Sequence, residues 1–267
     1  MTRPTDAADE SLKRQVHDFW NSRPCGTQFT ELEWGSRTFF DSVEAERYRR
    51  QPFMREAVGF DRYAGKKLLE IGCGLGTDSL QFARGGALVT GVDLTEQSIE
   101  LARRRFEMYG VPGTFQVADA EQLPFPDASF DVVYSFGVLH HTPDTPRAVR
   151  EVARVLKPGG EIVIMLYHRH STHVWLGYPV AMFGRLKRGQ KLLSLDEYFR
   201  VYDGEGNPLG KAYTQAEVLA MFKDFADLKL STWDPWRPRM PKFMNDLLLG
   251  LAKRYGFWLL IRGRKAR

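Results

Sequence analysis

Between residues 68 and 262 the chain alternates two hydrophobic patterns. Short apolar runs, such as residues 161–167, are typical of buried strands. Between them lie longer stretches in which apolar residues recur every three or four positions, as on the inner face of a helix. Strands and helices in regular succession predict parallel βαβ units, so we expect an α/β domain over residues 67–267.

Capping residues predict where two helices of this domain begin and end. Thr95 is a favoured N-cap, and Gly110 is suited to end the helix that follows. A second helix is expected to begin at Thr145, with Pro146 in its first turn, and to end before Pro158.

Residues 1–66 precede the first strand and are expected to form a helical cap over the substrate or cofactor. A helix beginning near Ser11 is predicted by apolar residues that share one helical face: Leu12, Val16, Phe19 and Trp20. A second helix is expected to begin at Asp41, with Glu44 completing a capping box, and to end at Pro52.

An insertion is predicted at residues 168–212, after the fifth strand. It mixes aromatic residues with lysine and arginine, a composition suited to a lid or a substrate pocket. A helix is expected after it, from Thr214. Residues 228–232 and 257–262 are then expected to form an antiparallel hairpin.

Composition narrows the setting of the protein. A hydrophobic content of 43% and a charged content of 27% are ordinary for a globular protein. With two cysteines, no signal peptide and no apolar run of about 18 residues, a reduced cytoplasmic protein that does not span a membrane is expected. From Arg237 onward the sequence has nine lysine or arginine residues and a single acidic residue, Asp246. We interpret this basic stretch mainly as a solvated surface.

A glycine-rich turn follows the first strand of the α/β domain, in the segment LEIGCGLG at residues 69–76. A helix leaves this turn, so its backbone amides would face a ligand. Asp93 ends the next strand, about twenty positions later, where a carboxylate binds ribose hydroxyls. Together these features predict a site for an adenosine ligand.

The spacing of the glycines argues against a dinucleotide. A dinucleotide site needs G-x-G-x-x-G/A, whereas Gly72, Gly74 and Gly76 give G-x-G-x-G and position 77 is threonine. Glu70 would also repel a pyrophosphate. An adenosine ligand that carries a cationic amino acid fits the turn better than NAD does.

The segment 69–76 resembles motif I of the class I S-adenosylmethionine-dependent methyltransferases. Three later segments, at residues 116–125, 130–135 and 155–161, resemble the third-strand exit, the fourth strand and the turn into the fifth strand of that family. The resemblance implies S-adenosylmethionine as cofactor. It also implies a Rossmann-like, seven-stranded, mostly parallel sheet with an antiparallel last strand and helices on both faces.

The resemblance places Asp119 at the adenine amino group and the backbone after the fourth strand, at Phe136, near the methionine ammonium. The residues expected to bind the cofactor are Glu70, Gly72, Cys73, Gly74, Gly76, Asp93, Leu94, Asp119, Ala120 and Phe136.

Candidate catalytic residues are few, because methyl transfer needs mainly alignment of the acceptor and exclusion of water. His140 and His141 follow the fourth strand, where an imidazole could act as a base; the alternative is that they pack beneath the cofactor and position the loop. Tyr48 lies on the second cap helix and could close over the cofactor or simply pack. His168, His170 and His173 lack an accompanying acidic ligand or cysteine, so no metal is assigned.

The sequence therefore predicts a methyltransferase that acts on oxygen or nitrogen of a small, apolar or aromatic metabolite. Carbon methylation of a quinone or lipid, methylation of nucleic acid, and cofactor binding without catalysis are the alternatives. Nucleic acid is disfavoured, because the fourth strand ends in Ser135-Phe136-Gly137 and lacks the turn that grips a base nitrogen. Peripheral contact with a membrane and the oligomeric state are left open.

Overall fold

The computed structural model describes residues 4–234, 246, 250 and 253–266. Its strands, in chain order, are β1 Lys67–Ile71, β2 Leu88–Asp93, β3 Thr114–Val117, β4 Phe130–Phe136, β5 Leu156–His168, β6 Ala212–Tyr213, β7 Phe225–Trp233 and β8 Trp258–Lys265. All eight belong to one sheet: seven lie in the order β3-β2-β1-β4-β5-β8-β7, and the short β6 pairs with β5 off this path. β8 runs opposite to the other strands and pairs antiparallel with both β5 and β7, so the expected mostly parallel sheet with an antiparallel last strand is confirmed.

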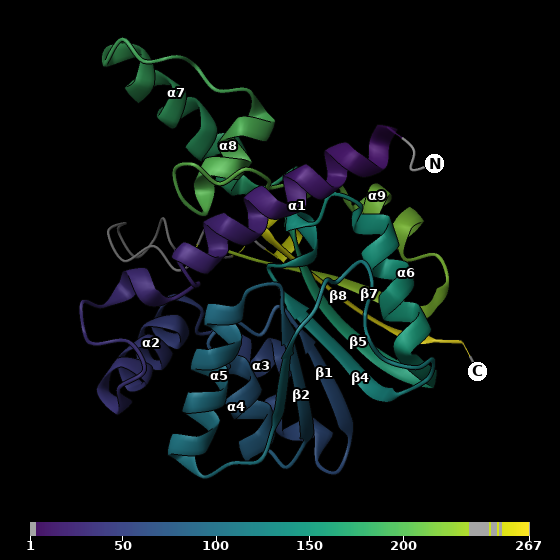
Figure 1. The fold of residues 1–267 in the computed structure, drawn as a ribbon. Coiled ribbons are helices and arrows are strands. Elements are labelled where there is room, and N and C mark those ends of the chain that lie inside the picture. Colours follow the sequence, from purple (N-terminus) through teal and green to yellow (C-terminus); the bar gives the residue numbers. More distant parts are fainter. Residues whose placement is uncertain (1–3, 235–245, 247–249, 251–252, 267) are drawn as a thin grey trace.

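Helices cover both faces of the sheet because its central strands are apolar on both sides (Figure 1). The helices that follow strands are α4 Thr77–Arg84, α5 Glu96–Tyr109, α6 Thr145–Val155 and α9 Gln215–Met221. Leu69 and Ile71 of β1 share a buried cluster with Val152 of α6. Leu68, the residue before Leu69, lies on the other face of the strand and shares a second buried cluster with Phe82 of α4. As predicted, α6 begins at Thr145, but it ends at Val155 because β5 already begins at Leu156.

The N-terminal region is helical, as expected, but its helices begin earlier than predicted. It comprises α1 Pro4–Ser22, η1 Thr27–Phe29, α2 Arg37–Arg50, α3 Met54–Val58 and η2 Phe60–Tyr63. Ser36 caps α2 by accepting a hydrogen bond from the amide of Phe39, so the predicted start at Asp41 was wrong. The earlier start places Phe39 and Phe40 on the buried face of the helix, and it leaves Glu44 free to bind arginines elsewhere.

The insertion after β5 forms helices that the sequence pattern did not predict. They are η4 His173–Gly177, α7 Tyr178–Lys187 and α8 Leu195–Tyr202. α7 projects away from the sheet, whereas α8 lies nearer to it (Figure 1). Phe199 anchors α8, because its side chain is fully buried among Phe257 and other residues of the core.

α1 crosses the edge of the sheet at which the parallel strands end (Figure 1). Lys13 binds Asp119 after β3, and His17 binds Glu96 after β2. The sheet order reverses direction between β1 and β4, which are adjacent although β2 and β3 separate them in sequence. Folds of this class bind ligands at such a reversal, outside the carboxyl ends of the strands.

Three basic residues near the C-terminus have structural partners. Arg262 donates to the backbone carbonyls of Ala57 and Val58, Arg264 pairs with Glu161, and Lys265 donates to a carbonyl of β5. Arg237, Arg239, Lys242 and Arg267 lie outside the described residues. Within the described part of the chain, no helix has the length and apolar character needed to cross a bilayer.

Candidate functional site

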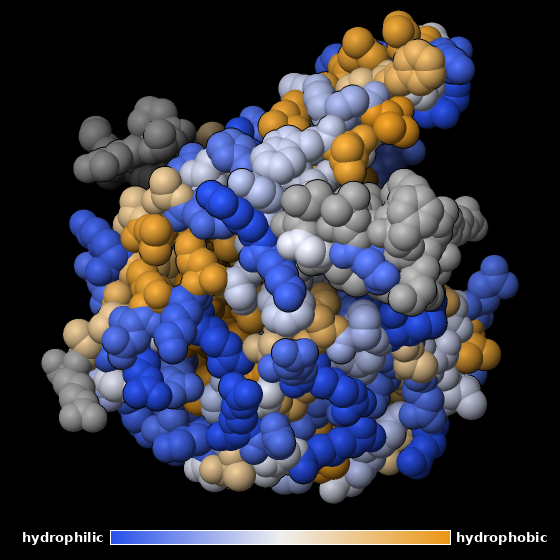
Figure 2. Space-filling view, turned by 180° about the vertical axis from the view of Figure 1, so that it is seen from behind, coloured by the Kyte–Doolittle hydropathy of each residue, from blue (hydrophilic) through white to orange (hydrophobic). Residues whose placement is uncertain are grey.

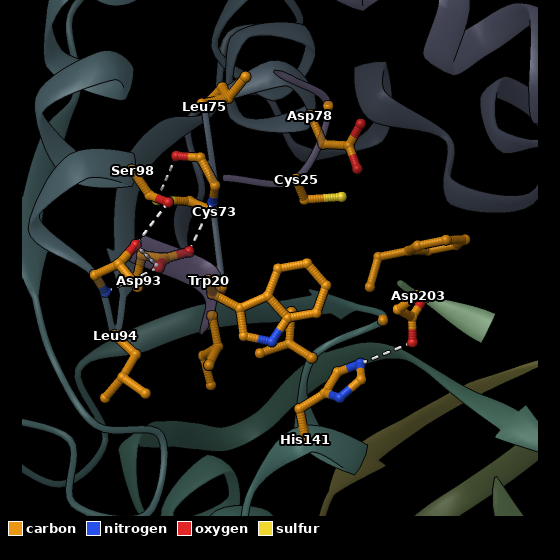
Figure 3. Close-up of a pocket in the computed structure, with 18 of the residues that line it drawn as sticks. Trp20, Cys25, Cys73, Leu75, Asp78, Asp93, Leu94, Ser98, His141 and Asp203 are labelled. Carbon is orange, nitrogen blue, oxygen red and sulfur yellow. Dashed lines mark hydrogen bonds and ion pairs between the residues drawn. The ribbon is translucent and has the colours of Figure 1, made fainter. Parts of the chain in front are cut away.

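A cavity of about 460 Å³ lies at the carboxyl ends of β1, β2 and β4, and the N-terminal helices line its other side (Figure 3). The expected site residues that line it are Glu70, Gly72, Cys73, Gly74, Asp93, Leu94, Asp119, Ala120, Phe136 and His141. Three expected residues do not line it: Tyr48, Gly76 and His140. The fold thus brings together in one wall residues that span positions 70 to 141.

The glycine turn is shaped by close backbone contacts. Gly72 has a φ of 73°, and a Cβ there would lie 2.2 Å from a methyl carbon of Val138. The amides of Gly72 and Cys73 both donate to the carbonyl of Val92, which ties the turn to the end of β2. Gly76 does not line the cavity; it occupies the N-cap position of α4 with a φ of 70°. Only glycine adopts these conformations without strain.

Asp93 is held rigidly at the end of β2. Its carboxylate accepts hydrogen bonds from the amide of Gly74 at 2.9 Å and from the amide and hydroxyl of Thr95 at 3.0 and 2.8 Å. Thr95 occupies the N-cap position of α5 as predicted, but its hydroxyl forms hydrogen bonds with Asp93 and Ser98 and not with an amide of the helix. Burial raises the pKa of Asp93, and the three hydrogen bonds oppose that shift.

Glu70 is a buried carboxylate that faces the cavity beside a second acid. Ser79 donates a hydrogen bond to Glu70, and burial and then the charge of Asp78 raise the pKa of Glu70 well above its ordinary value. Asp78 is itself neutralised by Arg47, which donates from Nε at 2.7 Å. A cation in the cavity would stabilise the ionised form of Glu70.

The network around Asp78 was not predicted from the sequence. Arg47, Tyr48 and Tyr134 all donate to its carboxylate. Burial alone would raise the pKa of Asp78, but Arg47 outweighs it and the pKa is lowered. Tyr48 donates its hydroxyl to this network and packs its ring on Phe60 without lining the cavity, so of the two alternatives for Tyr48 the structure shows the packed ring.

Lys13 of α1 reaches Asp119 at 2.7 Å and Glu121 at 2.8 Å. Burial acts to lower the pKa of Lys13, but its bonds to the two carboxylates outweigh this and raise it. The sequence analysis did not single out Lys13, although its position three residues before the buried Val16 places it on the same face of the helix.

His141 and Asp203 meet at the end of the cavity opposite Asp93 (Figure 3). The Nδ1 atom of His141 hydrogen-bonds the carbonyl oxygen of Leu209, and its Nε2 atom lies 3.3 Å from a carboxylate oxygen of Asp203. The hydroxyl of Tyr167 donates to the other carboxylate oxygen at 2.6 Å. Trp20 of α1 packs its edge against the imidazole, with ring centroids 5.4 Å apart. The insertion that carries Asp203 was predicted, but not this contact.

His140 lies beneath the site and not in it. Its side chain is fully buried, with its ring packed at a tilt on that of Tyr167, the ring centroids 4.0 Å apart, and neither ring nitrogen has a hydrogen-bond partner. Burial, followed by the neighbouring His141, lowers its pKa well below the ordinary value. Of the two candidate bases, only His141 therefore reaches the cavity.

The other three histidines named above are dispersed. His168 is buried and bonds the carbonyl of Gly256, His170 is exposed, and His173 packs against Tyr198 and Tyr202. Cys73 is buried and Cys25 is exposed toward the cavity; both are free thiols. Burial raises the pKa of the Cys73 thiol, so it is protonated at neutral pH.

Known proteins resemble the part of the chain that forms this site. Residues 69–164 match the family described as methyltransferase domain. The 27-O-demethylrifamycin SV methyltransferase of Amycolatopsis mediterranei is 43% identical over 104 residues, which cover 38% of this chain and 38% of that protein. The ubiquinone biosynthesis O-methyltransferase of Idiomarina loihiensis is 37% identical over 150 residues, 54% of this chain and 62% of that protein.

The matched segments therefore span less than two thirds of the length of either relative. Among solved structures, an S-adenosylmethionine-dependent methyltransferase from Mesorhizobium loti superposes with a TM-score of 0.57 at 22% identity, covering 80% of this chain and 97% of that one. This likeness shows a shared fold.

Proposed function

We propose that this protein is a class I S-adenosylmethionine-dependent methyltransferase that transfers the methyl group of that cofactor to oxygen or nitrogen of a small or medium-sized, apolar or aromatic metabolite. The match of residues 69–164 to the methyltransferase-domain family and the two methyltransferase relatives support this proposal. One observation carries the proposal. A single cavity joins the glycine turn and Asp93 at one end to aromatic side chains and His141 at the other.

The residues of the first end fit the cofactor. Asp93 would bind the ribose hydroxyls and Asp119 the adenine amino group, while the backbone of the glycine turn approaches the ligand closely. Glu70 is buried beside Asp78, and both burial and Asp78 disfavour its ionised form. The positive charge of the cofactor would stabilise that ionised form. When bound, the cofactor supplies a methyl group on a cationic sulfur.

The other end of the cavity suits an apolar acceptor. It is lined by the side chains of Trp20, Phe29, Met165, Tyr202 and Trp258. Aromatic rings offer large apolar contacts to a planar or hydrophobic molecule. The two relatives carry names that describe O-methylation, or methylation at a numbered oxygen, which favours oxygen as the acceptor atom here.

His141 is the residue that we assign to the acceptor proton. Its Nδ1–H donates to the carbonyl of Leu209, and this fixes the tautomer in which Nε2 accepts a proton. Asp203, 3.3 Å from Nε2, stabilises the imidazolium that forms, and Tyr167 holds the carboxylate in place. Asp203 and Tyr167 are thus positioning residues for the base.

Residues 1–66 serve in this proposal as a cap over the cofactor and the acceptor. Lys13, Val16, Trp20, Phe29 and Arg47 reach the cavity from its helices and loops. Closure by this segment would exclude water from the reacting atoms, which is the main requirement of an in-line displacement.

Methyl-labelled cofactor tests the proposal directly. The protein is incubated with it and with a fractionated cell extract, and the label is followed by mass spectrometry. We expect the label on oxygen or nitrogen of an apolar small molecule. Label on carbon, label in nucleic acid, or cofactor binding without any transfer would each refute the proposed reaction.

Asp93→Asn provides the binding control for this experiment. Removing the charge that holds the ribose should raise the Kd for S-adenosylmethionine by about tenfold or more, since a charge-assisted hydrogen bond contributes roughly 1.5–3 kcal/mol. Isothermal titration calorimetry measures the change. Asp224→Asn, an exposed acid beyond α9, should leave the Kd unchanged. Equal affinities in the two variants would contradict the ribose assignment.

A further inference from the structure

An amphipathic arm, residues 173–193, projects from the fold and carries an apolar surface that nothing in the described structure covers. α7 has no buried residue. Leu176, Val180, Phe183 and Leu186 recur at helical spacing, and their exposed fractions are 49%, 72%, 59% and 63%. Helices with this spacing normally bury the apolar face, so exposure of it indicates a partner.

The exposed apolar residues are concentrated and not scattered. Six of the twelve large hydrophobic side chains that are exposed in the described chain belong to the arm: Trp175, Leu176, Val180, Phe183, Leu186 and Leu192. Figure 2 shows them gathered along the projection, next to hydrophilic residues. A single exposed leucine needs no explanation, but a contiguous group on a projecting helix marks an interaction surface.

The charge of the segment has one sign. Residues 168–194 contain Arg169, Arg185, Lys187, Arg188 and Lys191 and no aspartate or glutamate. Lys187 lies over the ring of Phe183 at 4.6 Å, so a cation sits directly on the apolar surface. Lys191 pairs with Glu197 of α8. The other cations of the arm, Arg185, Lys187 and Arg188, make its outer part strongly basic.

We propose that this arm docks on the surface of an anionic lipid bilayer. Val180, Phe183 and Leu186 would enter the region between headgroups and acyl chains, and Lys187 and Arg188 would meet lipid phosphates. A helix with an apolar face flanked by cations has the chemistry of an interfacial helix. A second copy of the arm is a poorer partner, because the two basic surfaces would repel each other.

The position of the arm connects the bilayer to the cavity. The same insertion continues into α8, and Tyr202 and Asp203 at the end of α8 line the cavity. Docking of the arm would therefore hold this end of the cavity close to the membrane surface. The proposal does not depend on the reaction, because it rests on exposure and charge alone.

Sedimentation with vesicles tests this proposal on the full chain. Large vesicles of phosphatidylcholine with about 30% phosphatidylglycerol are compared with vesicles of phosphatidylcholine alone. We expect binding to the anionic vesicles that weakens as salt is added. Val180→Ser/Phe183→Ser and, separately, Lys187→Glu/Arg188→Glu should each lower the partition coefficient by about tenfold. Neither pair is buried, so both variants should fold, which circular dichroism verifies.

Matched controls lie elsewhere on the surface. Leu88→Ser/Leu219→Ser removes two exposed leucines, and Lys66→Glu reverses an exposed charge at the opposite edge of the sheet. Both should bind vesicles as the unchanged protein does. Absence of binding to anionic vesicles, or equal losses in the arm and control variants, would overturn the proposal. So would a dimer in gel filtration that Val180→Ser/Phe183→Ser converts to a monomer, because the arm would then be an interface between copies.

Discussion

At the scale of single residues, the two neighbouring histidines after β4 have opposite environments. His141 faces the cavity, with Nδ1 bonded to the carbonyl of Leu209 and Nε2 3.3 Å from a carboxylate oxygen of Asp203, whereas His140 is buried beneath Tyr167. Their adjacency in sequence made them equivalent candidates. The turn Leu139–His141 separates them, because consecutive side chains of a helical turn point in different directions.

His141→Gln should lower kcat by about 10²–10⁴-fold, the usual contribution of a general base. The Kd for S-adenosylmethionine should change little, because the imidazole lies at the acceptor end. Single-turnover rates with the acceptor identified by labelling give the first quantity, and calorimetry gives the second. His170→Gln, an exposed histidine, is the control and should retain full activity. An unchanged kcat in His141→Gln would mean that alignment alone drives the reaction.

At the scale of elements, α1 acts as a strap across the carboxyl edge of the sheet. Lys13, His17 and Trp20 each contact a residue that follows a different strand. The hydrogen bonds that His17 donates to the carboxylates of Asp18 and then Glu96 raise the pKa of His17. Two of these three contacts are polar side-chain bonds, so the strap is held less firmly than the helices that pack on the sheet.

Lys13→Met tests how the strap is held. The substitution keeps the length of the side chain but removes its ion pairs with Asp119 and Glu121. We expect amide hydrogen exchange in α1 to become about tenfold faster, because part-buried ion pairs contribute roughly 1.5 kcal/mol to closing such a segment. Mass spectrometry of exchange gives the result, with α5 as internal reference. Arg14→Met, an exposed neighbour, should not change exchange; if Lys13→Met behaves the same, Trp20 and His17 hold the helix without Lys13.

At the scale of the whole molecule, one buried arginine joins the N-terminal helices to the α/β core. Arg105 of α5 is fully buried and donates to Thr77 at 2.7 Å, to the carbonyl of Phe40 and to Glu44 at 3.0 Å. Burial lowers the pKa of Arg105, and Glu44 opposes that shift. The side chain therefore connects α2, α4 and α5 through polar bonds inside the core.

Arg105→Met should lower the free energy of unfolding by about 3 kcal/mol, since it leaves buried partners unpaired. Urea unfolding followed by tryptophan fluorescence and by far-ultraviolet circular dichroism provides the measurement. We expect the two transitions to coincide, because the helices and the sheet share this contact. Arg104→Met, exposed on the same helix, should change stability by less than about 0.5 kcal/mol. Separate transitions in the unchanged protein would show that the cap folds independently.

The sequence determined the strand and helix order, the glycine turn and Asp93, because these depend on local patterns: apolar periodicity, positive φ at glycines and an acid at a strand end. It also predicted the antiparallel hairpin and the insertion. It misplaced the start of α2, where Ser36 and Asp41 offered competing caps and burial of Phe39 and Phe40 decided between them.

Only the tertiary structure decided which residues meet across long separations. It placed Lys13 on Asp119, Arg47 and Tyr48 on Asp78, and Asp203 on His141. No periodicity encodes such contacts, because each depends on how two distant elements pack. The tertiary structure also left α7 without a core to cover, and this turned an apolar stretch that the sequence analysis assigned to a pocket or lid into an exposed surface.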